Sequence, residues 1–269
     1  FMMYFLSVVL IGTVYPIFLE VLSSQKISVG PPFYHKLIIP FLIPFMLVMA
    51  IGPKLKWIKS KVDDKANLII SFVISIVLSF IIVKNFSSNS LVNTILISSA
   101  LYLFFITIRD FFISKNKNFP QNIAHFGFSL LILSILFNNL FSSEIITNLK
   151  VGETFENSKT KIILESISQK KEKNYKSILT NFTIESSDGD IEKLSPELRV
   201  YNQPNIVTSE ADIKTTLMSD KFIAINIVQN QDYFNVRYQI KPFMLWIWLS
   251  VLLISFGGMM SFLKKEYEQ

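Results

Sequence analysis

The stretch SKNKNFPQNIAHFGFSLLILSILFNNLF, residues 114–141, places a short basic segment before a long, mostly apolar run. The run is close to the ~20 residues that an α-helix needs to cross the hydrocarbon core of a bilayer. It also carries His125, one of only two histidines in the chain. The stretch therefore predicts a membrane-spanning helix with an ionisable side chain near one end.

The composition of the whole chain points to a membrane protein. Half of it is apolar: hydrophobic residues make up 51%, 25 of the 269 residues are Phe, and the mean hydropathy is +0.43. Apolar stretches cover residues 2–22, 37–53, 67–83, 91–113, 121–142 and 242–263. Each is near the length of a membrane span. We therefore expect a polytopic α-helical membrane protein with about six transmembrane helices.

The net charge of +6 is unevenly distributed. Residues 143–241 carry thirteen Lys/Arg and fourteen Asp/Glu, whereas the rest of the chain carries thirteen Lys/Arg and six Asp/Glu. The excess of cations belongs to the membrane part, which argues against nucleic-acid binding. These cations gather in alternate loops: Lys54, Lys56, Lys59, Lys61 and Lys65 in one, and Arg109, Lys115 and Lys117 in another. The positive-inside rule then predicts that the chain starts inside and that residues 23–36, 84–90 and 143–241 lie outside.

Residues 143–241 differ in character from the apolar stretches. They contain short β-prone runs, such as SILTNFTIESS and YFNVRYQI, separated by turn-like segments such as SDGD and NQPN. We expect three parts. Residues 1–142 form a membrane domain with five transmembrane helices, residues 143–241 form a β-rich extracytoplasmic domain, and residues 242–269 form the last helix and a short cytoplasmic tail.

Several kinds of site are absent from the sequence. The chain has no Cys, which excludes disulfides, thiolate metal sites and thiol nucleophiles. We find no nucleotide-binding loop, zinc motif or hydrolytic triad. His35 follows Gly-Pro-Pro, which favours a structured loop and not a ligand. Pro40 and Pro44 predict that the second helix is kinked or starts late.

His125 is the candidate site residue, and the residues alone leave two interpretations open. It lies about one turn, ~6 Å, inside the expected helix start, where a lone histidine is often only interfacial. Alternatively, a neutral imidazole in a membrane helix binds a metal or haem iron, with Gln121 or Ser129 orienting its second nitrogen. No second histidine lies in another expected span, so a bis-histidine haem would need a partner from outside this chain.

Besides a haem-binding or metal-binding membrane protein, two other classes of protein fit six apolar spans with a β-rich insert. A permease with an extracytoplasmic β domain and no cofactor would be expected to show paired intramembrane charges or broken helices in matched repeats. Only the second span is broken, and no second half mirrors the first. An assembly scaffold, in which His125 is incidental, is the third possibility.

Three ordered stretches resemble the C-terminal part of the CcmF family, the haem lyase of cytochrome c maturation. The segment IGTVYPIFLEVLSSQKISVGPPFYHKLIIPFLIPFMLVMAIGPKLKW (11–57) resembles that family's GT-x-x-P…S-V-G-x-P…G-P segment. AHFGFSLLILSI (124–135) resembles its A-H-x-G helix, and RYQIKPFMLWIWLSVLLISFGGMMSFL (237–263) resembles its K-P-x-x-x-W-I-W…GG terminus. The resemblance covers essentially the whole chain.

The resemblance implies a function. The family takes haem from the haem chaperone CcmE and attaches it covalently to apocytochrome c, which CcmH/CcmI-type subunits deliver. It also holds a b-type haem in the inner membrane, which is thought to use quinol to reduce the incoming haem iron. The A-H-x-G histidine, an axial ligand of that haem, maps onto His125.

The chain also departs from the family pattern. The tryptophan-rich segment, the two external haem-ligating histidines and the other intramembrane histidine of the family lie upstream and are not in this sequence, which begins with Phe. The resemblance therefore implies a truncated piece, or one subunit of a split version as in some mitochondria. We expect such a piece to be inactive in thioether formation without the upstream region.

Overall fold

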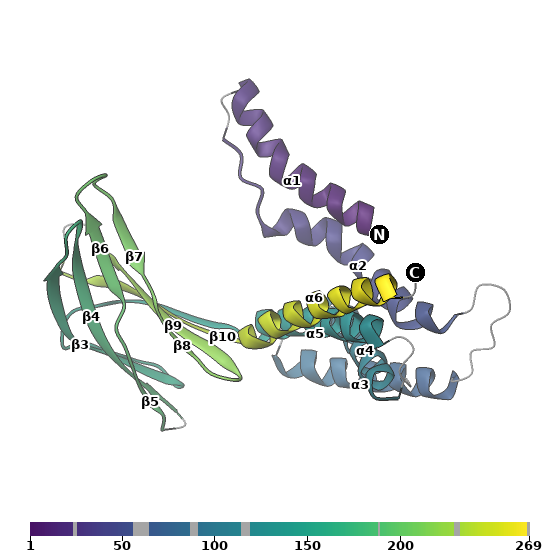
Figure 1. Ribbon diagram of the computed structural model, residues 1–269. Helices are drawn as coiled ribbons and strands as arrows, with labels where there is room; N and C mark the ends of the chain where they lie inside the picture. Colours follow the sequence, from purple (N-terminus) through teal and green to yellow (C-terminus); the bar gives the residue numbers. More distant parts are fainter. Residues whose placement is uncertain are drawn as a thin grey trace. The chain divides into compact units, whose positions relative to one another are not determined.

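The computed structural model describes residues 1–23, 26–55, 65–86, 91–113, 119–187, 189–228 and 232–267 (Figure 1). Five of the predicted loop cations, Lys56, Lys59, Lys61, Lys115 and Lys117, lie outside these ranges. The chain divides into two compact units. The helical unit comprises Phe1–Leu136 and Leu249–Gln269, and the sandwich unit comprises Phe137–Trp248.

Within the described residues, six helices are long and apolar enough to cross a membrane. They are α1 (Met2–Ser23), α2 (Pro31–Ile51), α3 (Lys65–Phe86), α4 (Leu91–Ile113), α5 (Phe119–Phe141) and α6 (Met244–Tyr267), with a short 3-10 turn, η1 (Gly52–Lys54), after α2. Helices suit this role because their backbone N–H and C=O groups bond to one another and not to lipid. The predicted polytopic membrane protein with six spanning helices is confirmed.

The start of α2 differs from the prediction. The helix begins at Pro31 and continues through Pro40 and Pro44. It therefore starts before residue 37, where the apolar stretch begins, and the predicted late start was wrong. Proline is well suited to the first helical positions, because its fixed φ matches the helix and its missing N–H would have no helical partner there. His35 therefore lies in the first turns of a helix, and our assignment of it to a loop was wrong.

Two glycines allow α5 and α6 to approach closely within the helical unit. A Cβ atom added to Gly257 would come within 2.7 Å of the backbone nitrogen of Ala124 and of the carbonyl oxygen of Pro120. A Cβ at Gly127 would lie 3.0 Å from the backbone nitrogen of Ile254. Small residues commonly permit this contact between membrane helices, because lipid leaves packing as the main source of association.

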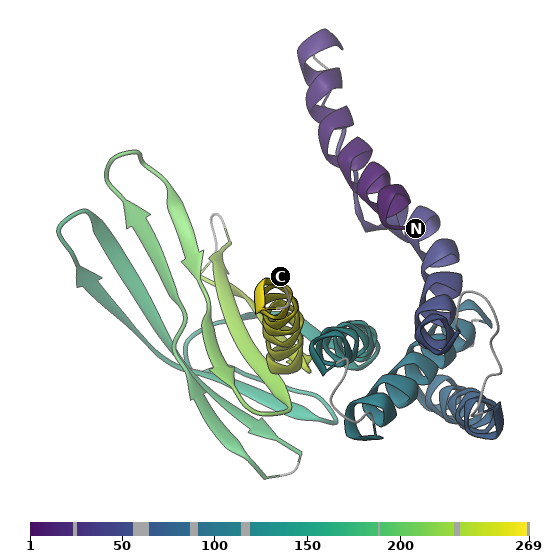
Figure 2. The same cartoon turned by 45° about the vertical axis from the view of Figure 1, so that its right-hand side comes forward.

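In the part of the sandwich unit that the structure describes, ten strands form two antiparallel sheets (Figures 1 and 2). The first sheet has the order β1-β10-β9-β8, and the second β2-β3-β4-β6-β7, with β5 also paired to β4. Their bounds are β1 (Ser143–Leu149), β2 (Thr154–Glu156), β3 (Thr160–Lys171), β4 (Tyr175–Ser186), β5 (Ile191–Leu194), β6 (Glu197–Tyr201), β7 (Val207–Glu210), β8 (Asp212–Thr215), β9 (Ser219–Ile227) and β10 (Phe234–Pro242). The predicted β-rich insert before the last helix is thus confirmed.

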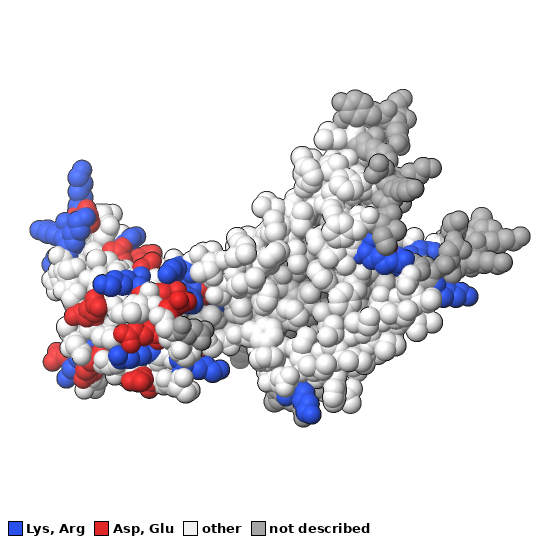
Figure 3. All heavy atoms as spheres, turned by 90° about the horizontal axis from the view of Figure 1, so that it is seen from below, with Lys and Arg blue, Asp and Glu red and all other residues white. Residues whose placement is uncertain are grey.

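An apolar core lies between the two sheets. Its largest fully buried members come from both sheets and include Phe182, Ile162, Leu164, Leu198, Ile223, Ile225 and Val236. Burial of such side chains is the main source of stability for a sandwich of this kind. Most charged residues lie on the outside of this unit, and on the face shown in Figure 3 they gather over it, whereas the described helical surface shows only a few cations.

The strand β10 passes into α6 through one residue, Phe243. Its φ of +62° is unusual for a residue with a side chain, and it costs on the order of 1 kcal/mol. The N–H of Phe243 donates to the carbonyl of Met218 at 2.8 Å, and its ring packs against Phe137 and Phe141 with centroids 5.6 and 6.4 Å away. These contacts offset the backbone cost and fix the point where the sheet ends and the membrane helix begins.

We expect Gly257→Ala to weaken the α5–α6 contact, because the new methyl group meets backbone atoms that cannot move aside. Overpacking of this kind costs about 1–3 kcal/mol. Thermal unfolding of the detergent-solubilised chain measures the loss. Gly258→Ala is the matched control, since nothing lies within 4 Å of a Cβ atom there. Equal stability of the two variants would contradict the close contact.

A second prediction concerns Glu192, whose side chain is only 8% exposed and whose Oε1 lies 3.0 Å from Nζ of Lys221 and 3.3 Å from Nζ of Lys214. Burial raises the pKa of this carboxyl, but the hydrogen bonds and charges of the two lysines outweigh burial and hold its pKa below the ordinary value. A lowered pKa in the folded state stabilises the fold above the unfolded value, about 4.3, and this contribution is lost as the pH falls through the folded pKa.

Glu192→Gln should therefore destabilise the sandwich unit near neutral pH, by about 1–3 kcal/mol, and the deficit should shrink below about pH 4.3. Thermal unfolding followed by the β-sheet circular dichroism signal, measured across this pH range, tests the prediction. Glu156→Gln, at an exposed position on β2, serves as the control and should change little. A Glu192→Gln deficit that is independent of pH would show that charge pairing is not its cause.

Candidate functional site

His125 lies on α5, six residues after the helix begins at Phe119. Six residues of rise place it about 9 Å along the helix axis. The side chain is partly exposed. Among the described residues, its ring makes no hydrogen bond.

One side of His125 faces a small cavity of about 20 Å³ within the helical unit. Its walls come from three helices and the turn after α2: Met49, Ala50, Pro53, Ile106, Thr107, Asp110, Asn122 and His125. A cavity needs about 10–15 Å³ to admit one water molecule, which must find several polar partners. This cavity meets both conditions for a single water: its volume is sufficient, and half of its lining residues carry polar side chains.

One residue that lines the cavity, Asp110, forms an ion pair. The ammonium group of Lys54, in η1, lies 2.6 Å from Oδ1 of Asp110 on α4, and both side chains are largely buried. Asn122 of α5, one turn before His125, donates from Nδ2 to the backbone carbonyl of Asp110 at 3.2 Å. The structure pairs Asp110 with a residue 56 positions away in the sequence. Sequence reasoning missed both contacts to Asp110.

The two residues proposed from helical spacing to orient His125 have other roles. The Ser129 hydroxyl is fully buried, lies 2.7 Å from Oγ1 of Thr107 and donates to the carbonyl of Phe126. Gln121 is exposed, and neither Gln121 nor Ser129 lines the cavity. The polar side chains that the structure brings to the His125 cavity are instead Asn122, Asp110 and Thr107.

Aromatic rings surround the rest of this helix segment. Phe128 packs edge-on against Phe45 of α2 with centroids 5.7 Å apart, and Phe126 lies 5.9 and 5.7 Å from Phe104 and Phe111 of α4. These contacts hold α5 against α2 and α4 on both sides of His125. The imidazole is therefore presented from a fixed, mostly apolar surface.

His35, the other histidine, lies far from His125. Met49 lines the His125 cavity, and fourteen residues of α2 separate it from His35. At 1.5 Å of rise per residue, this is about 21 Å. The two histidines cannot ligate the same iron. Among the described residues, no group of three or more His, Cys, Asp or Glu side chains could hold a metal ion.

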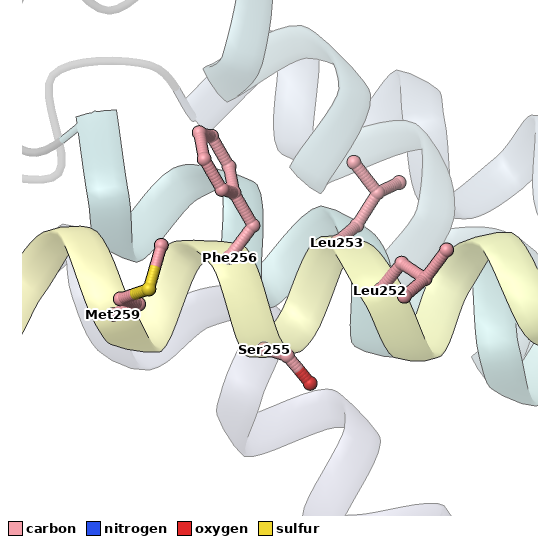
Figure 4. A pocket seen from close by; sticks show the side chains of 5 residues that line it. All are labelled: Leu252, Leu253, Ser255, Phe256 and Met259. Carbon is pink, nitrogen blue, oxygen red and sulfur yellow. The ribbon is translucent and has the colours of Figure 1, made fainter.

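A larger groove, of about 460 Å³, runs along α6 (Figure 4). Its lining comes from that helix alone: Leu252, Leu253, Ser255, Phe256 and Met259. The Ser255 hydroxyl donates to the carbonyl of Val251, one turn back. The groove offers no charged group and no nitrogen ligand for iron, so the polar cavity beside His125 remains the candidate site.

Comparison with known proteins supports the family suggested by the motifs. Residues 140–242 match the family model described as the CcmF C-terminal beta-sandwich. Over 97% of its length, the chain is 28% identical to the cytochrome c-type biogenesis protein CcmF of Pseudomonas fluorescens and 25% identical to that of Escherichia coli K12. The resemblance to the C-terminal part of CcmF is confirmed.

These matches cover nearly all of this chain but less than half of each relative. The chain spans only 42% of the length of the two CcmF relatives. A solved structure of the cytochrome c haem lyase CcmF superposes on 95% of the chain with a TM-score of 0.69 and 16% sequence identity, covering 43% of that chain. At this identity the superposition establishes a shared fold with CcmF and not a shared activity.

The Lys54–Asp110 pair leads to a prediction about the helical unit. Asp110→Asn leaves a largely buried ammonium without its carboxylate partner, and we expect it to destabilise this unit by about 1.5–3 kcal/mol. Thermal unfolding in detergent measures the effect. Glu20→Gln removes a pair whose atoms lie 3.6 Å apart and whose side chains are mostly exposed, so it should cost less than about 1 kcal/mol. An Asp110→Asn variant as stable as Glu20→Gln would refute the structural role of the pair.

Proposed function

We propose that the chain acts in cytochrome c maturation as the C-terminal part of a haem lyase, in which His125 provides one axial ligand to an intramembrane b-type haem. The observation that carries this proposal is the position of His125. It is a membrane-helix histidine without a hydrogen bond among the described residues, partly exposed on one side and facing a polar cavity on the other. Ionisable groups inside a membrane are costly and usually serve a function.

The geometry fits a haem that is shared with another polypeptide segment. The 20 Å³ cavity is far too small for a porphyrin, so the haem would lie against the partly exposed side of the His125 ring. The helix segment that carries His125 is rich in aromatic rings, since Phe126 and Phe128 follow it closely and pack against α4 and α2. When bound, haem supplies an iron centre that carries one electron.

The second ligand would come from outside this chain. His35 lies about 21 Å along α2 from the cavity beside His125, so it cannot be the second ligand. His125 itself would bind only one face of the haem. CcmF relatives are more than twice as long as this chain, so an upstream segment of the same lyase is the natural source. The chain's own contribution would be to hold and orient one imidazole.

The polar cavity suggests how that orientation is achieved. A ligating histidine usually donates its second ring N–H to a carboxylate, a carbonyl or water, which fixes the ring and raises its basicity. In this site a single water could bridge His125 to Asp110, Asn122 or Thr107, which line the same cavity. The Lys54–Asp110 pair holds the carboxylate in place.

We also propose that the β-sandwich lies on the periplasmic side of the inner membrane, or in the corresponding compartment of a mitochondrion. The positive-inside rule places the loops before α3 and α5 in the cytoplasm. The Lys54–Asp110 pair and the bond from Asn122 join the C-terminal ends of α2 and α4 to the beginning of α5. An alternating topology puts these three helix ends on one side of the membrane, as the contacts require.

The partners follow from the same assignment. On the periplasmic side the chain would work with the upstream part of the lyase, the haem chaperone CcmE, and apocytochrome c with its CcmH/CcmI-type delivery subunits. Quinol would reach the b haem from the membrane. The thioether bonds themselves form between haem vinyl groups and cysteine thiols of the apocytochrome, so this Cys-free chain supplies no thiol.

To test the ligand assignment, the chain is co-expressed with the upstream part of Pseudomonas fluorescens CcmF, and the purified complex is examined for a b-type haem spectrum. His125→Ala should lose most of the bound haem, because one axial ligand is gone. His35→Ala, which removes the other histidine, should retain it. A His125→Ala complex with a full b-type spectrum would falsify the assignment, and a wild-type complex without haem would remove the basis for the lyase.

A further inference from the structure

The turn between β8 and β9, Thr216–Ser219, carries two large apolar residues at its tip. Leu217 and Met218 are 61% and 59% exposed, although tight turns usually place Gly, Asn, Asp or Pro at such positions. The turn is well formed, since the Thr216 N–H donates to the Ser219 carbonyl at 3.0 Å, and the Ser219 N–H donates to the Thr216 hydroxyl. The two side chains are therefore held outward on a closed turn.

The tip lies beside the first turn of α6. Trp246, the third residue of that helix, donates from its indole N–H to the carbonyl of Leu217 at 3.0 Å, and Phe243 donates to the carbonyl of Met218 at 2.8 Å. All of these residues belong to the sandwich unit. Two hydrogen bonds thus fix the level of the tip relative to the start of a membrane span (Figure 1).

That level corresponds to the membrane–water interface. The spanning part of α6, Met244–Leu263, has 20 residues and a length of about 30 Å, which equals the thickness of the hydrocarbon core. Trp246 lies about 3 Å inside its start, where tryptophan is favoured because its ring is apolar and its N–H is polar. A group bonded to this indole N–H lies at the same depth.

We propose that the Leu217–Met218 tip inserts into the interfacial layer of the bilayer and is a second, monotopic membrane contact of the β-sandwich. Its occupant is lipid because the tip, Thr216–Ser219, carries no charge, is bonded to the first turn of α6 and presents two largely exposed apolar side chains. This contact limits how far the sandwich can tilt about its connections to α5 and α6. The inference depends on membrane insertion and is independent of haem binding.

The natural absence of Cys makes a direct test possible. Leu217→Cys and Met218→Cys, each in the full chain, are labelled with an environment-sensitive fluorophore and reconstituted in phosphatidylethanolamine–phosphatidylglycerol liposomes. Quenching is measured with doxyl-labelled lipids and with aqueous iodide. Because both side chains are exposed, neither variant removes a core contact, and each checks the other.

Ile206→Cys is the matched control, at a site 50% exposed near the start of β7. The Ser209 hydroxyl donates to the carbonyl of Ile225, seven residues along β9 from Met218, or about 23 Å at 3.3 Å per residue. Ile206 precedes Ser209 in the sequence and lies farther from the tip than this distance.

The labels at 217 and 218 should show blue-shifted emission, loss of fluorescence with doxyl lipids and protection from iodide, whereas the label at 206 should show the reverse. Quenching of the tip labels by iodide would mean that the tip lies in water. Protection from both quenchers would mean that protein covers it. Either result would overturn the proposal.

Discussion

Hydrocarbon offers no hydrogen-bond partner to a peptide group, and the rest of this structure depends on that constraint. The six helices satisfy their backbone groups internally. The passage from β10 into α6 occurs at Phe243, at the boundary of a span. There the unusual backbone conformation is held by a hydrogen bond to Met218 and by the rings of Phe137 and Phe141. Sheet pairing begins almost at once, with Ser143 opposite Ile240.

The same constraint explains how α5 and α6 can carry a β-sandwich between them. The strands β1 and β10 continue from the ends of these two helices and pair with each other, so the helix ends must be neighbours. Asn138 donates to the carbonyl of Pro242 within the sandwich unit, and Gly127 and Gly257 allow close packing within the helical unit. Each unit therefore independently requires the two helices to be adjacent.

The sequence predicted the elements that are long and strongly patterned. Apolar runs near twenty residues predicted the six helices, and the β-prone runs SILTNFTIESS and YFNVRYQI correspond to β4 and β10. The strands β1, β2, β5, β7 and β8 were missed because they lie mostly at sheet edges and expose polar side chains, and all but β1 are only three or four residues long. The early start of α2 was missed because Gly-Pro-Pro is equally compatible with a loop and with a helix N-terminus.

At the candidate site, the sequence identified the histidine but not the residues that surround it. A histidine in an apolar helix can be identified from one segment, and the i−3 spacing of Asn122 was available there too. Lys54 and Asp110 are 56 positions apart in the sequence, so their contact could not be predicted from any single segment. Helical spacing instead suggested Ser129, whose hydroxyl the structure commits to Thr107. The ring of His125 thus borders water-sized polar space on one side and is partly exposed on the other. An imidazole that binds iron on one nitrogen and is oriented through the other needs this asymmetry.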